Sequence, residues 1–457
     1  MPYVFKDSDY QNAIKIQKLK EQKSIPTTKV QRATKFIATG AKIGRNYIKH
    51  YGKKLVDPST TRDQLNEDNA SDIYDSLSKL KGSALKVAQM LSMDKNLLPK
   101  EYQKQFSLAQ YSAPPLSYPL VVKTFQTYFG KNPSQIFDTF SPKAINAASM
   151  GQVHRATLGE KVLAVKIQYP GVSDTVKSDL AMVKPIALRM FKLNQMEYEE
   201  FIGEVELRLL EEADYTLELK RSMDMSVKCK AIKNLIFPTY YPKYSTPKIL
   251  TMDWLEGQPL GEYLKKGKPD KETANRLGQA MWDFYHFQFH QLKAVHADPH
   301  PGNFIITTDE KLGVIDFGCV KEIPEDYYKL YFQFHHKEIL EDPIRMEKLF
   351  YDRKFIYEDD SEREKKFFKA VFKELLELLA RPFFTKQFDF ADPAYFETLY
   401  KTGERLSNMK ELRESKKARG IKHALYINRT YFGLYSILNE LGATVNTHSY
   451  LPSWKSF

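Results

Sequence analysis

The sequence predicts a mixed α+β fold, in which a strand-rich stretch interrupts a largely helical chain. One observation is the apolar, β-branched segment KVLAVKIQ around residue 165, which is typical of a buried strand. A second is the hairpin pattern of residues 304–315, where apolar pairs flank a polar turn. A third is the helical spacing of apolar residues elsewhere, as in residues 362–380.

Composition places the chain among globular proteins. Its 457 residues are 42% apolar and 28% charged, enough to bury one large or two moderate cores. The two cysteines, Cys229 and Cys319, exclude a disulfide framework, so we expect a reducing compartment. The start of the chain lacks a secretory pattern, and no run of about 18 apolar residues predicts a membrane span. We therefore expect a cytoplasmic protein with at most peripheral membrane contact.

The N-terminal arm carries most of the net charge of +12. Residues 1–55 contain 13 Lys/Arg against three acidic residues. Such an arm suits an anionic partner, namely lipid headgroups, nucleic acid or an acidic protein, although a solvated basic tail has the same composition. Nucleic acid is not expected, because few aromatics are interleaved with the cations and no known module follows.

Residues 30–55 of this arm predict an amphipathic helix. Its apolar side chains recur at roughly helical spacing among the cations: Phe36, Ile37, Ile43, Tyr47, Ile48 and Tyr51. A basic amphipathic helix suits the surface of an anionic membrane, and docking on the protein itself is the equal alternative. Gly40 and Gly44 weaken the helix prediction. The polar link 57–69 that follows predicts a domain boundary.

A second helix is predicted from Ser71 onward, where seven apolar residues share one face. Lys86 and Gln89 lie three residues apart on one surface of this helix. By themselves they read as solvated side chains beside an apolar stripe. Shorter helices are predicted at residues 100–110 and 119–129.

Lys166 lies inside the predicted strand around residue 165, and a buried lysine is costly unless an anion pairs with it. The helical stretch that follows supplies Glu212, Asp214 and Glu218, of which Glu218 is the candidate partner. Glu212 and Glu218 are about 600° of helical rotation apart, so one helix does not easily present both to the same lysine. Small residues before the strand would let backbone N–H groups approach a phosphate: Ala147, Ala148, Ser149 and Gly151.

The segment 296–318, which opens with HADPHPGNF and closes with DFG, concentrates hard oxygen ligands of the kind that Mg²⁺ takes: Asp298, Asn303 and Asp316. An acidic residue, an Asn five positions later and an Asp before Phe-Gly form the phosphotransfer half-site of kinases. Asp298 would then position or deprotonate a nucleophile, while Asn303 and Asp316 would hold the metal. The alternative is an ordinary hairpin with polar turns. A zinc site through the two histidines of the segment is disfavoured, because the segment itself contains no cysteine and no further histidine.

A further strand, KILTMDWLEG, runs into a turn at residues 256–257. In a kinase this is the place of the hinge, where backbone groups receive an adenine. The residues in that place are Met252, Asp253, Trp254 and Leu255.

Taken in chain order, these motifs resemble those of the UbiB-type atypical kinases, the AarF or ADCK/COQ family of the protein-kinase-like superfamily. The resemblance covers roughly residue 71 to the end. It rests on the lysine-glutamine helix, the alanine-rich loop at 146–149, Lys166, the Glu-x-Asp pair with Glu218, HADPHPGNF and DFG. It implies a bilobed protein-kinase-like fold with an N-terminal helical extension that covers the active site.

The resemblance also implies a division into four parts: a basic arm at 1–56, a helical extension at 70–140, an N-lobe at 141–253 and a helical C-lobe at 254–457. In this family the lysine-glutamine helix lies over the active site and contacts the Glu-x-Asp pair. The resemblance thus implies a regulatory role for Lys86 and Gln89 together with Glu212 and Asp214. A helix over the active site would also hinder the access of a protein substrate.

The chain departs from the family pattern at two positions and in one segment. Ala88 stands where the family's Lys-x-Gly-Gln has glycine, and Asn146 stands where the alanine-rich loop begins with alanine. The second change bears on nucleotide preference. The C-terminal transmembrane pair of some bacterial relatives is absent from the sequence, so any membrane contact is expected to be peripheral.

The resemblance implies an ATPase or a small-molecule or lipid kinase that uses ATP and Mg²⁺ and supports ubiquinone or other isoprenoid-lipid metabolism. An isoprenoid lipid or quinone precursor would be its partner. Lys166 would hold the phosphates, oriented by Glu218, beside the catalytic Asp298. The alternative, from a different class, is a nucleotide-gated module that binds ATP and a lipid or protein partner with little turnover.

Overall fold

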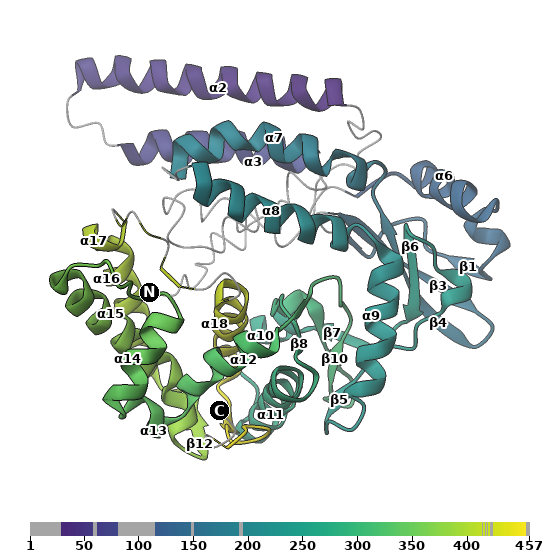
Figure 1. The fold of residues 1–457 in the computed structure, drawn as a ribbon. Coiled ribbons are helices and arrows are strands. Elements are labelled where there is room, and N and C mark those ends of the chain that lie inside the picture. The colour runs from purple at the N-terminus through teal and green to yellow at the C-terminus, as the bar shows by residue number, and fades with distance from the viewer. Residues whose placement is uncertain are drawn as a thin grey trace. The chain divides into compact units, whose positions relative to one another are not determined.

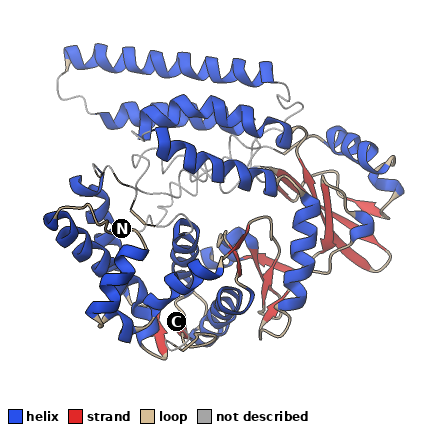
Figure 2. Ribbon diagram, in the orientation of Figure 1, coloured by secondary structure: helices blue, strands red, loops and turns tan. Residues whose placement is uncertain are grey.

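The computed structural model describes residues 29–57, 62–80, 115–147, 150–191, 195–413, 415, 417, 419–420 and 424–453. These residues form the mixed α+β fold that the sequence predicts, with helices and strands in each of two compact units (Figures 1 and 2). We call residues 29–220 and 239–254 the N-terminal unit, and residues 221–238 and 255–453 the C-terminal unit. The helix predicted at 100–110 lies outside the described residues.

An antiparallel sheet is the centre of the N-terminal unit. Its strands run in the order β1-β3-β4-β6, and β2 pairs with β3. The strands are β1 (Thr139–Phe140), β2 (Asn146–Ala147), β3 (Gly151–Leu158), β4 (Lys161–Gln168) and β6 (Ile249–Asp253). The turn between β3 and β4 places Gly159 at a φ of 58°, a conformation that glycine adopts without steric cost.

The two faces of β4 belong to different clusters. Its odd-numbered residues pack with α6 (Tyr118–Phe129) in one apolar cluster: Leu163, Val165 and Ile167. Ala164 packs in a second cluster on the other face. Because alternate residues of a strand point to opposite faces, Lys166 shares the face of Ala164. Tyr215, the first residue of α9 (Tyr215–Lys228), lies in that second cluster.

Long helices complete the N-terminal unit. α2 (Lys29–Val56) contacts both α3 (Arg62–Leu80) and α7 (Val172–Phe191) (Figure 1). α7 in turn contacts α8 (Gln195–Glu212).

The predicted polar link at 57–69 is wrong in extent, because α3 already begins at Arg62. Leu65 is 5% exposed and Asn69 is 1% exposed, so this polar-looking stretch packs against its neighbours. Tertiary packing of this kind supplies most of the stability of helices in proteins.

The predicted helix at 30–55 is confirmed, but its packing is not the one that an amphipathic pattern suggests. α2 lies against the protein through polar side chains such as Arg32 and Asn46, whereas Ile37 and Ile48 are exposed. The helix therefore docks on its own protein and still leaves Ile37 and Ile48 on the surface.

The C-terminal unit holds three small sheets. A four-stranded sheet has the order β5-β10-β9-β7, while β8 pairs with β11 and β12 pairs with β13. The strands are β5 (Leu235–Ile236), β7 (Gly257–Pro259), β8 (Ala294–His296), β9 (Phe304–Thr307), β10 (Leu312–Val314), β11 (Val320–Glu322), β12 (Gln387–Asp389) and β13 (Thr444–Asn446). The predicted hairpin is confirmed as β9 and β10, with Gly313 opposite Ile305.

Helices surround an aromatic core in this unit, in which Trp282, Tyr285 and Phe289 are fully buried. The helices are α10 (Leu260–Lys265), α11 (Lys271–Phe287), α12 (Glu325–Phe332), α13 (Lys337–Leu340), α14 (Pro343–Asp352), α15 (Glu362–Ala380), α16 (Pro393–Asn408), α17 (Lys410–Arg413) and α18 (Ala424–Leu441). Within the described ranges of both units, no helix combines the length and apolarity needed to cross a membrane.

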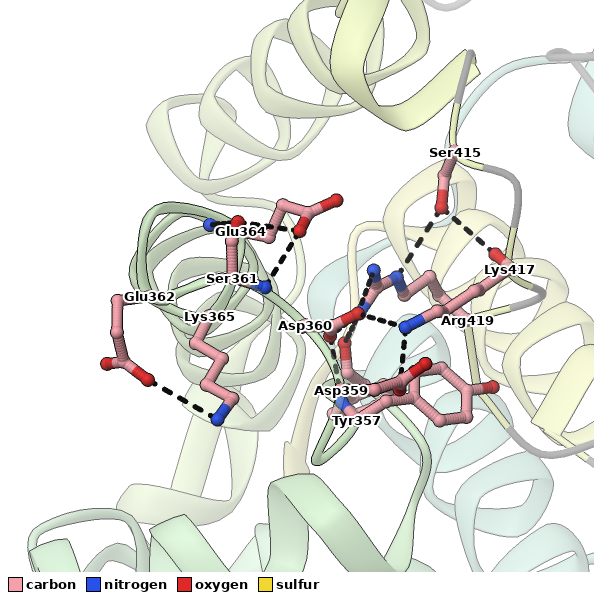
Figure 3. A network of polar contacts seen from close by, with 11 residues as sticks. Tyr357, Asp359, Asp360, Ser361, Glu362, Glu364, Lys365, Ser415, Lys417 and Arg419 are labelled. Carbon is pink, nitrogen blue, oxygen red and sulfur yellow. Dashed lines mark hydrogen bonds and ion pairs between the residues drawn. The ribbon is translucent and has the colours of Figure 1, made fainter.

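A network of charges fixes the start of α15 (Figure 3). Ser361 and Glu364 form a reciprocal capping box, in which the Glu364 carboxylate accepts the Ser361 N–H at 2.9 Å. The preceding Asp360 accepts hydrogen bonds from Lys417, at 2.8 Å, and from Arg419. Burial alone would raise the pKa of Asp360, but the hydrogen bonds from Arg419 and Lys417 outweigh it and hold this pKa below its ordinary value. The network ties the segment before α18 to α15.

Candidate active site

Lys166 and Glu218 form the ion pair that the sequence predicts. Lys166 Nζ lies 2.7 Å from Oε1 and 2.9 Å from Oε2 of Glu218. The glutamate side chain is 1% exposed and the lysine side chain 19% exposed, so the carboxylate is sealed while the lysine side chain stays partly open to solvent. The ammonium also lies 5.0 Å from the centroid of the Tyr215 ring. A compact charge fixed in this way is suited to contact an anionic ligand.

Asp214 lies at a break between two helices, which corrects the single helix predicted here. α8 ends at Glu212, and α9 begins three residues later. The Asp214 carboxylate accepts hydrogen bonds from two N–H groups in the first turn of α9, at 2.9 and 3.3 Å, which is how a side chain caps a helix. Because of this break, helical spacing does not relate Glu212 to Glu218. Glu218 reaches Lys166 from the first turn of α9.

The small-residue loop has two described members. Ala147 lies in β2, and its N–H donates to the side-chain oxygen of Asn146 at 2.8 Å. Gly151 begins β3, where an added Cβ would lie 2.6 Å from Tyr215 Oη. Close packing therefore explains this glycine without any ligand. The other two predicted members lie outside the described residues: Ala148 and Ser149.

The four residues predicted to receive an adenine span the end of β6. Met252 is buried within that strand. The N–H groups of Asp253 and Trp254 donate to backbone carbonyl oxygens of the N-terminal unit, each at 2.9 Å. Leu255 is the first residue of this chain segment in the C-terminal unit. At least two of the four residues thus have a backbone N–H that is already engaged.

Asp298, Asn303 and Asp316 come together in the C-terminal unit. Asn303 Nδ2 donates to the carbonyl oxygen of Asp298 at 2.9 Å and to its Oδ2 at 3.3 Å. The Ile315 N–H donates to the carbonyl oxygen of Asn303 at 3.1 Å, which holds the residue before Asp316 beside Asn303. Asp316 Oδ1 accepts the Gly318 N–H at 2.8 Å. Backbone and side-chain bonds therefore join the three predicted residues.

These donor groups fit Mg²⁺. With Nδ2 of Asn303 bonded to Asp298, Oδ1 is the amide atom left to act as a metal ligand, and Asp316 supplies carboxylate oxygens. Mg²⁺ takes few protein ligands and completes its shell with phosphates and water. In the described part of the chain, no three His, Cys, Asp or Glu side chains are placed to hold a metal ion. A site that holds Mg²⁺ through Asn303 and Asp316 would take its remaining ligands from a substrate's phosphates and from water.

The two histidines of the segment do not form a metal pair. His296 is fully buried, and its Nδ1 lies 3.1 Å from the Tyr285 hydroxyl oxygen. Burial lowers the pKa of His296 despite the nearby carboxylates of Asp298 and Asp316. His300 Nδ1 accepts a backbone N–H two residues further on, at 3.0 Å. The zinc alternative therefore has no support among the described residues.

Arg429 contacts the candidate site and was not predicted from the sequence. It lies on α18, and its Nη2 donates to Asp298 Oδ1 at 3.0 Å. The same helix comes so near that a Cβ on Gly433 would lie 2.3 Å from Pro299 Cγ. These two contacts hold the Asp298 loop against α18. The available signal was a single cation in the otherwise uncharged run ALYINRTYFGLYSIL.

The predicted regulatory residues are only partly described. Lys86 and Gln89 lie outside the described residues. Of their predicted partners, Glu212 is half-buried at the end of α8 and Asp214 is exposed. The regulatory contact therefore stays a prediction.

Comparison with known proteins bears on the family and the fold. The family model described as the ABC1 atypical kinase-like domain matches residues 108–350. A chloroplastic aarF domain-containing protein kinase of Arabidopsis thaliana, described as uncharacterised, is 32% identical over 61% of this chain and 40% of its own length. The mitochondrial atypical kinase COQ8 of Saccharomyces cerevisiae is 28% identical over 67% of this chain and 62% of its own length. The chain thus spans less than two thirds of these curated relatives.

A solved structure supports the fold. The complex of Rv3197 with erythromycin from Mycobacterium tuberculosis superimposes with a TM-score of 0.58 at 24% identity. The similarity covers 85% of this chain and 95% of that one, and it concerns the fold alone.

Proposed function

Because the chain belongs to the ABC1 atypical kinase-like family, we propose that it is an ATP-binding, Mg²⁺-dependent phosphotransferase or ATPase. The observation that carries the proposal is the Lys166–Glu218 pair, in which a sealed carboxylate holds a partly exposed lysine. The oxygen ligands of Asn303 and Asp316 support it independently.

Each residue has a distinct role in this proposal. Lys166 contacts the nucleotide phosphates, and Glu218 holds its ammonium in place. Asn303 and Asp316 hold Mg²⁺, which supplies positive charge against the phosphates. Asp298 orients or deprotonates the attacking group. Phosphoryl transfer depends mainly on positioning and electrostatic stabilisation, so these few side chains suffice.

For the phosphate acceptor, we propose water or a small lipid-linked molecule, not a protein hydroxyl. The resemblance to UbiB-type kinases supports a place in ubiquinone or other isoprenoid-lipid metabolism, and an atypical kinase named COQ8 is among the relatives. A quinone precursor or an isoprenoid lipid would then be the partner. The match covers 40% and 62% of these two relatives, so their similarity alone does not assign a reaction to this chain. The reaction is therefore part of the proposal.

ATP turnover in the presence of Mg²⁺ tests the proposed site. Asp316→Asn should lower turnover by at least about 100-fold, because the metal loses a charged ligand. The matched control is Asp309→Asn, on the exposed turn of the same hairpin, where Asp309 pairs with Lys311 at 2.7 Å. The control should turn over ATP like the wild type. Equal turnover by the wild type and Asp316→Asn would contradict the assignment.

A nucleotide-gated binding module is the second candidate, because the basic N-terminal arm offers a surface for a lipid or protein partner. Its helix α2 carries exposed apolar side chains, Ile37 and Ile48, among lysines and arginines. Such a module would bind ATP together with a lipid or protein partner. Calorimetric ATP binding by the wild type with no phosphate release in the turnover assay would favour it.

A further inference from the structure

The inner face of α2 is polar. Its buried side chains among those described are Arg32, Thr39, Asn46 and His50. Arg32 makes two hydrogen bonds to the Asp179 carboxylate on α7, at 2.6 and 2.5 Å. Asn46 donates to Asn69 at 3.1 Å and to Asp72 at 2.9 Å, both on α3. This face is specified by polar bonds, so α2 does not need its apolar side chains to dock.

The outer face of α2 is apolar and exposed. Ile37 is 73% exposed and Ile48 is 77% exposed. Eleven residues advance a helix by about 1,100°, only 20° beyond three full turns, so the two isoleucines lie on one line along the helix. Tyr47 and Tyr51 flank this line at 45% and 51% exposed. Isolated exposed isoleucines are ordinary, but four large apolar side chains on one face of one helix form a patch.

Cations surround this patch. α2 contains eight Lys/Arg and no Asp or Glu between Lys29 and Val56. The cations that are exposed include Lys35, Arg45, Lys49, Lys53 and Lys54. By helical rotation, Arg45 and Lys49 border the isoleucine line on one side. The patch is therefore an apolar stripe set in a strongly positive surface.

We propose that the outer face of α2 lies on an anionic lipid bilayer. Ile37 and Ile48 enter the boundary between headgroups and acyl chains, and Tyr47 and Tyr51 stay at the level of the headgroups. The helix axis lies parallel to the membrane surface, the arrangement of an interfacial amphipathic helix. Arg45 and the lysines beside it contact the anionic headgroups. The proposal does not depend on the proposed enzymatic function.

Charge decides between a bilayer and a second copy of the chain. Gly40 and Gly44 have no atom within 4 Å of an added Cβ, so another helix could approach α2 closely there. Two copies of α2 would, however, bring together the exposed cations of both helices, with no acidic residue on either helix. Like charges at such distances repel, whereas phosphate headgroups neutralise them.

Co-sedimentation of the full chain with vesicles tests the proposal. We expect binding to vesicles of phosphatidylcholine with phosphatidylglycerol, weaker binding as salt rises, and little binding to phosphatidylcholine alone. The double variant Ile37→Ser/Ile48→Ser should bind the anionic vesicles about tenfold more weakly, because its apolar contribution is lost. Arg45→Gln/Lys49→Gln should lose a similar factor, and only at low salt.

Ile344→Ser is the matched control, since Ile344 is 82% exposed on α14 in the other unit. It should bind vesicles like the wild type. Because Ile37 and Ile48 are exposed, the double variant should keep the wild-type thermal unfolding midpoint, which separates lost binding from lost folding. Equal binding to neutral vesicles, or undiminished binding by the double variant, overturns the proposal. A third result also overturns it: the double variant binds vesicles like the wild type but loses self-association in analytical ultracentrifugation. That result would assign the outer face of α2 to a second copy of the chain.

Discussion

Two ion pairs of the N-terminal unit have similar distances and different access to solvent. Arg32 and Asp179 are joined at 2.6 and 2.5 Å, and Lys166 and Glu218 at 2.7 and 2.9 Å. The side chains of the first pair are 3% and 0% exposed, so both charges are shielded from solvent. In the second pair the carboxylate is equally sealed, but the lysine is 19% exposed. Exposure of one partner, not the length of the bond, distinguishes a pair that only joins helices from one suited to a ligand.

A third pair extends the comparison to the C-terminal unit. Arg429 and Asp298 are 3.0 Å apart, and their side chains are 21% and 20% exposed. Both partners are accessible to a similar degree. On the same reasoning, we propose that Arg429 orients the Asp298 carboxylate, and we expect the pair to contribute more to ATP turnover than to stability.

Breaking the sealed pair should give the largest effect, and on stability. Asp179→Ala leaves the Arg32 guanidinium buried without its carboxylate, which costs about 3–5 kcal/mol of unfolding free energy. Urea denaturation followed by circular dichroism measures it. Lys177→Ala is the control on the same helix: Lys177 forms an exposed pair with Glu206 and should leave unfolding nearly unchanged. ATP turnover per folded molecule should be unaffected by Asp179→Ala, and a specific fall in turnover would show that the sealed pair is not purely structural.

Altering the half-accessible pair without removing its charge should affect turnover and spare stability. Lys166→Arg keeps a cation beside Glu218 but replaces a compact ammonium by a planar guanidinium, so phosphate contact is misplaced. We expect turnover to fall by about 100-fold with little change in unfolding. Lys161→Arg, on the exposed start of the same strand, should behave as the wild type. If Lys166→Arg destabilises the fold as strongly as Asp179→Ala does, the distinction by solvent access fails.

Loosening the third pair should give the smallest effect. Arg429→Gln removes the charge that holds Asp298, and we expect about a tenfold lower kcat with the KM for ATP nearly unchanged, because a positioning contact is lost and not a nucleotide contact. Arg429→Lys should restore part of kcat. The control Arg405→Gln breaks the exposed pair with Glu374 in the same unit and should leave both constants alone. Equal losses for Gln and Lys variants would argue against a positioning role for the charge.

Sequence reasoning succeeded where a local pattern demands a partner or a shape. A lysine within the apolar strand β4 required an anion, Glu218 was the candidate, and the ion pair is present. The apolar pairs on either side of a polar turn predicted a hairpin, and β9 and β10 form it. In both cases a buried neighbourhood leaves few physical solutions, so a short stretch of chain carries enough information.

Sequence reasoning failed where two distant segments decide the outcome. Arg429 follows Asp298 by 131 residues, and no periodicity connects them. For α2, the pattern showed two faces but not which one packs inward. That choice depends on α7, where Asp179 provides a carboxylate for Arg32. The helix break at Asp214 was also missed. The sequence showed Asp214 only as part of the Glu-x-Asp pair, whereas its carboxylate caps α9 by accepting the Thr216 N–H.

The contact of α18 with the Asp298 loop also limits how far the chain can be shortened from its C-terminal end while the candidate site keeps its shape. Similarity to the family model stops at residue 350, whereas Arg429 and Gly433 lie well beyond it. A fragment trimmed to the matched segment would keep Asp298, Asn303 and Asp316 and lose the helix that braces them. The minimal unit able to hold this loop in shape therefore extends through Leu441, about 90 residues past the boundary that family similarity alone would draw.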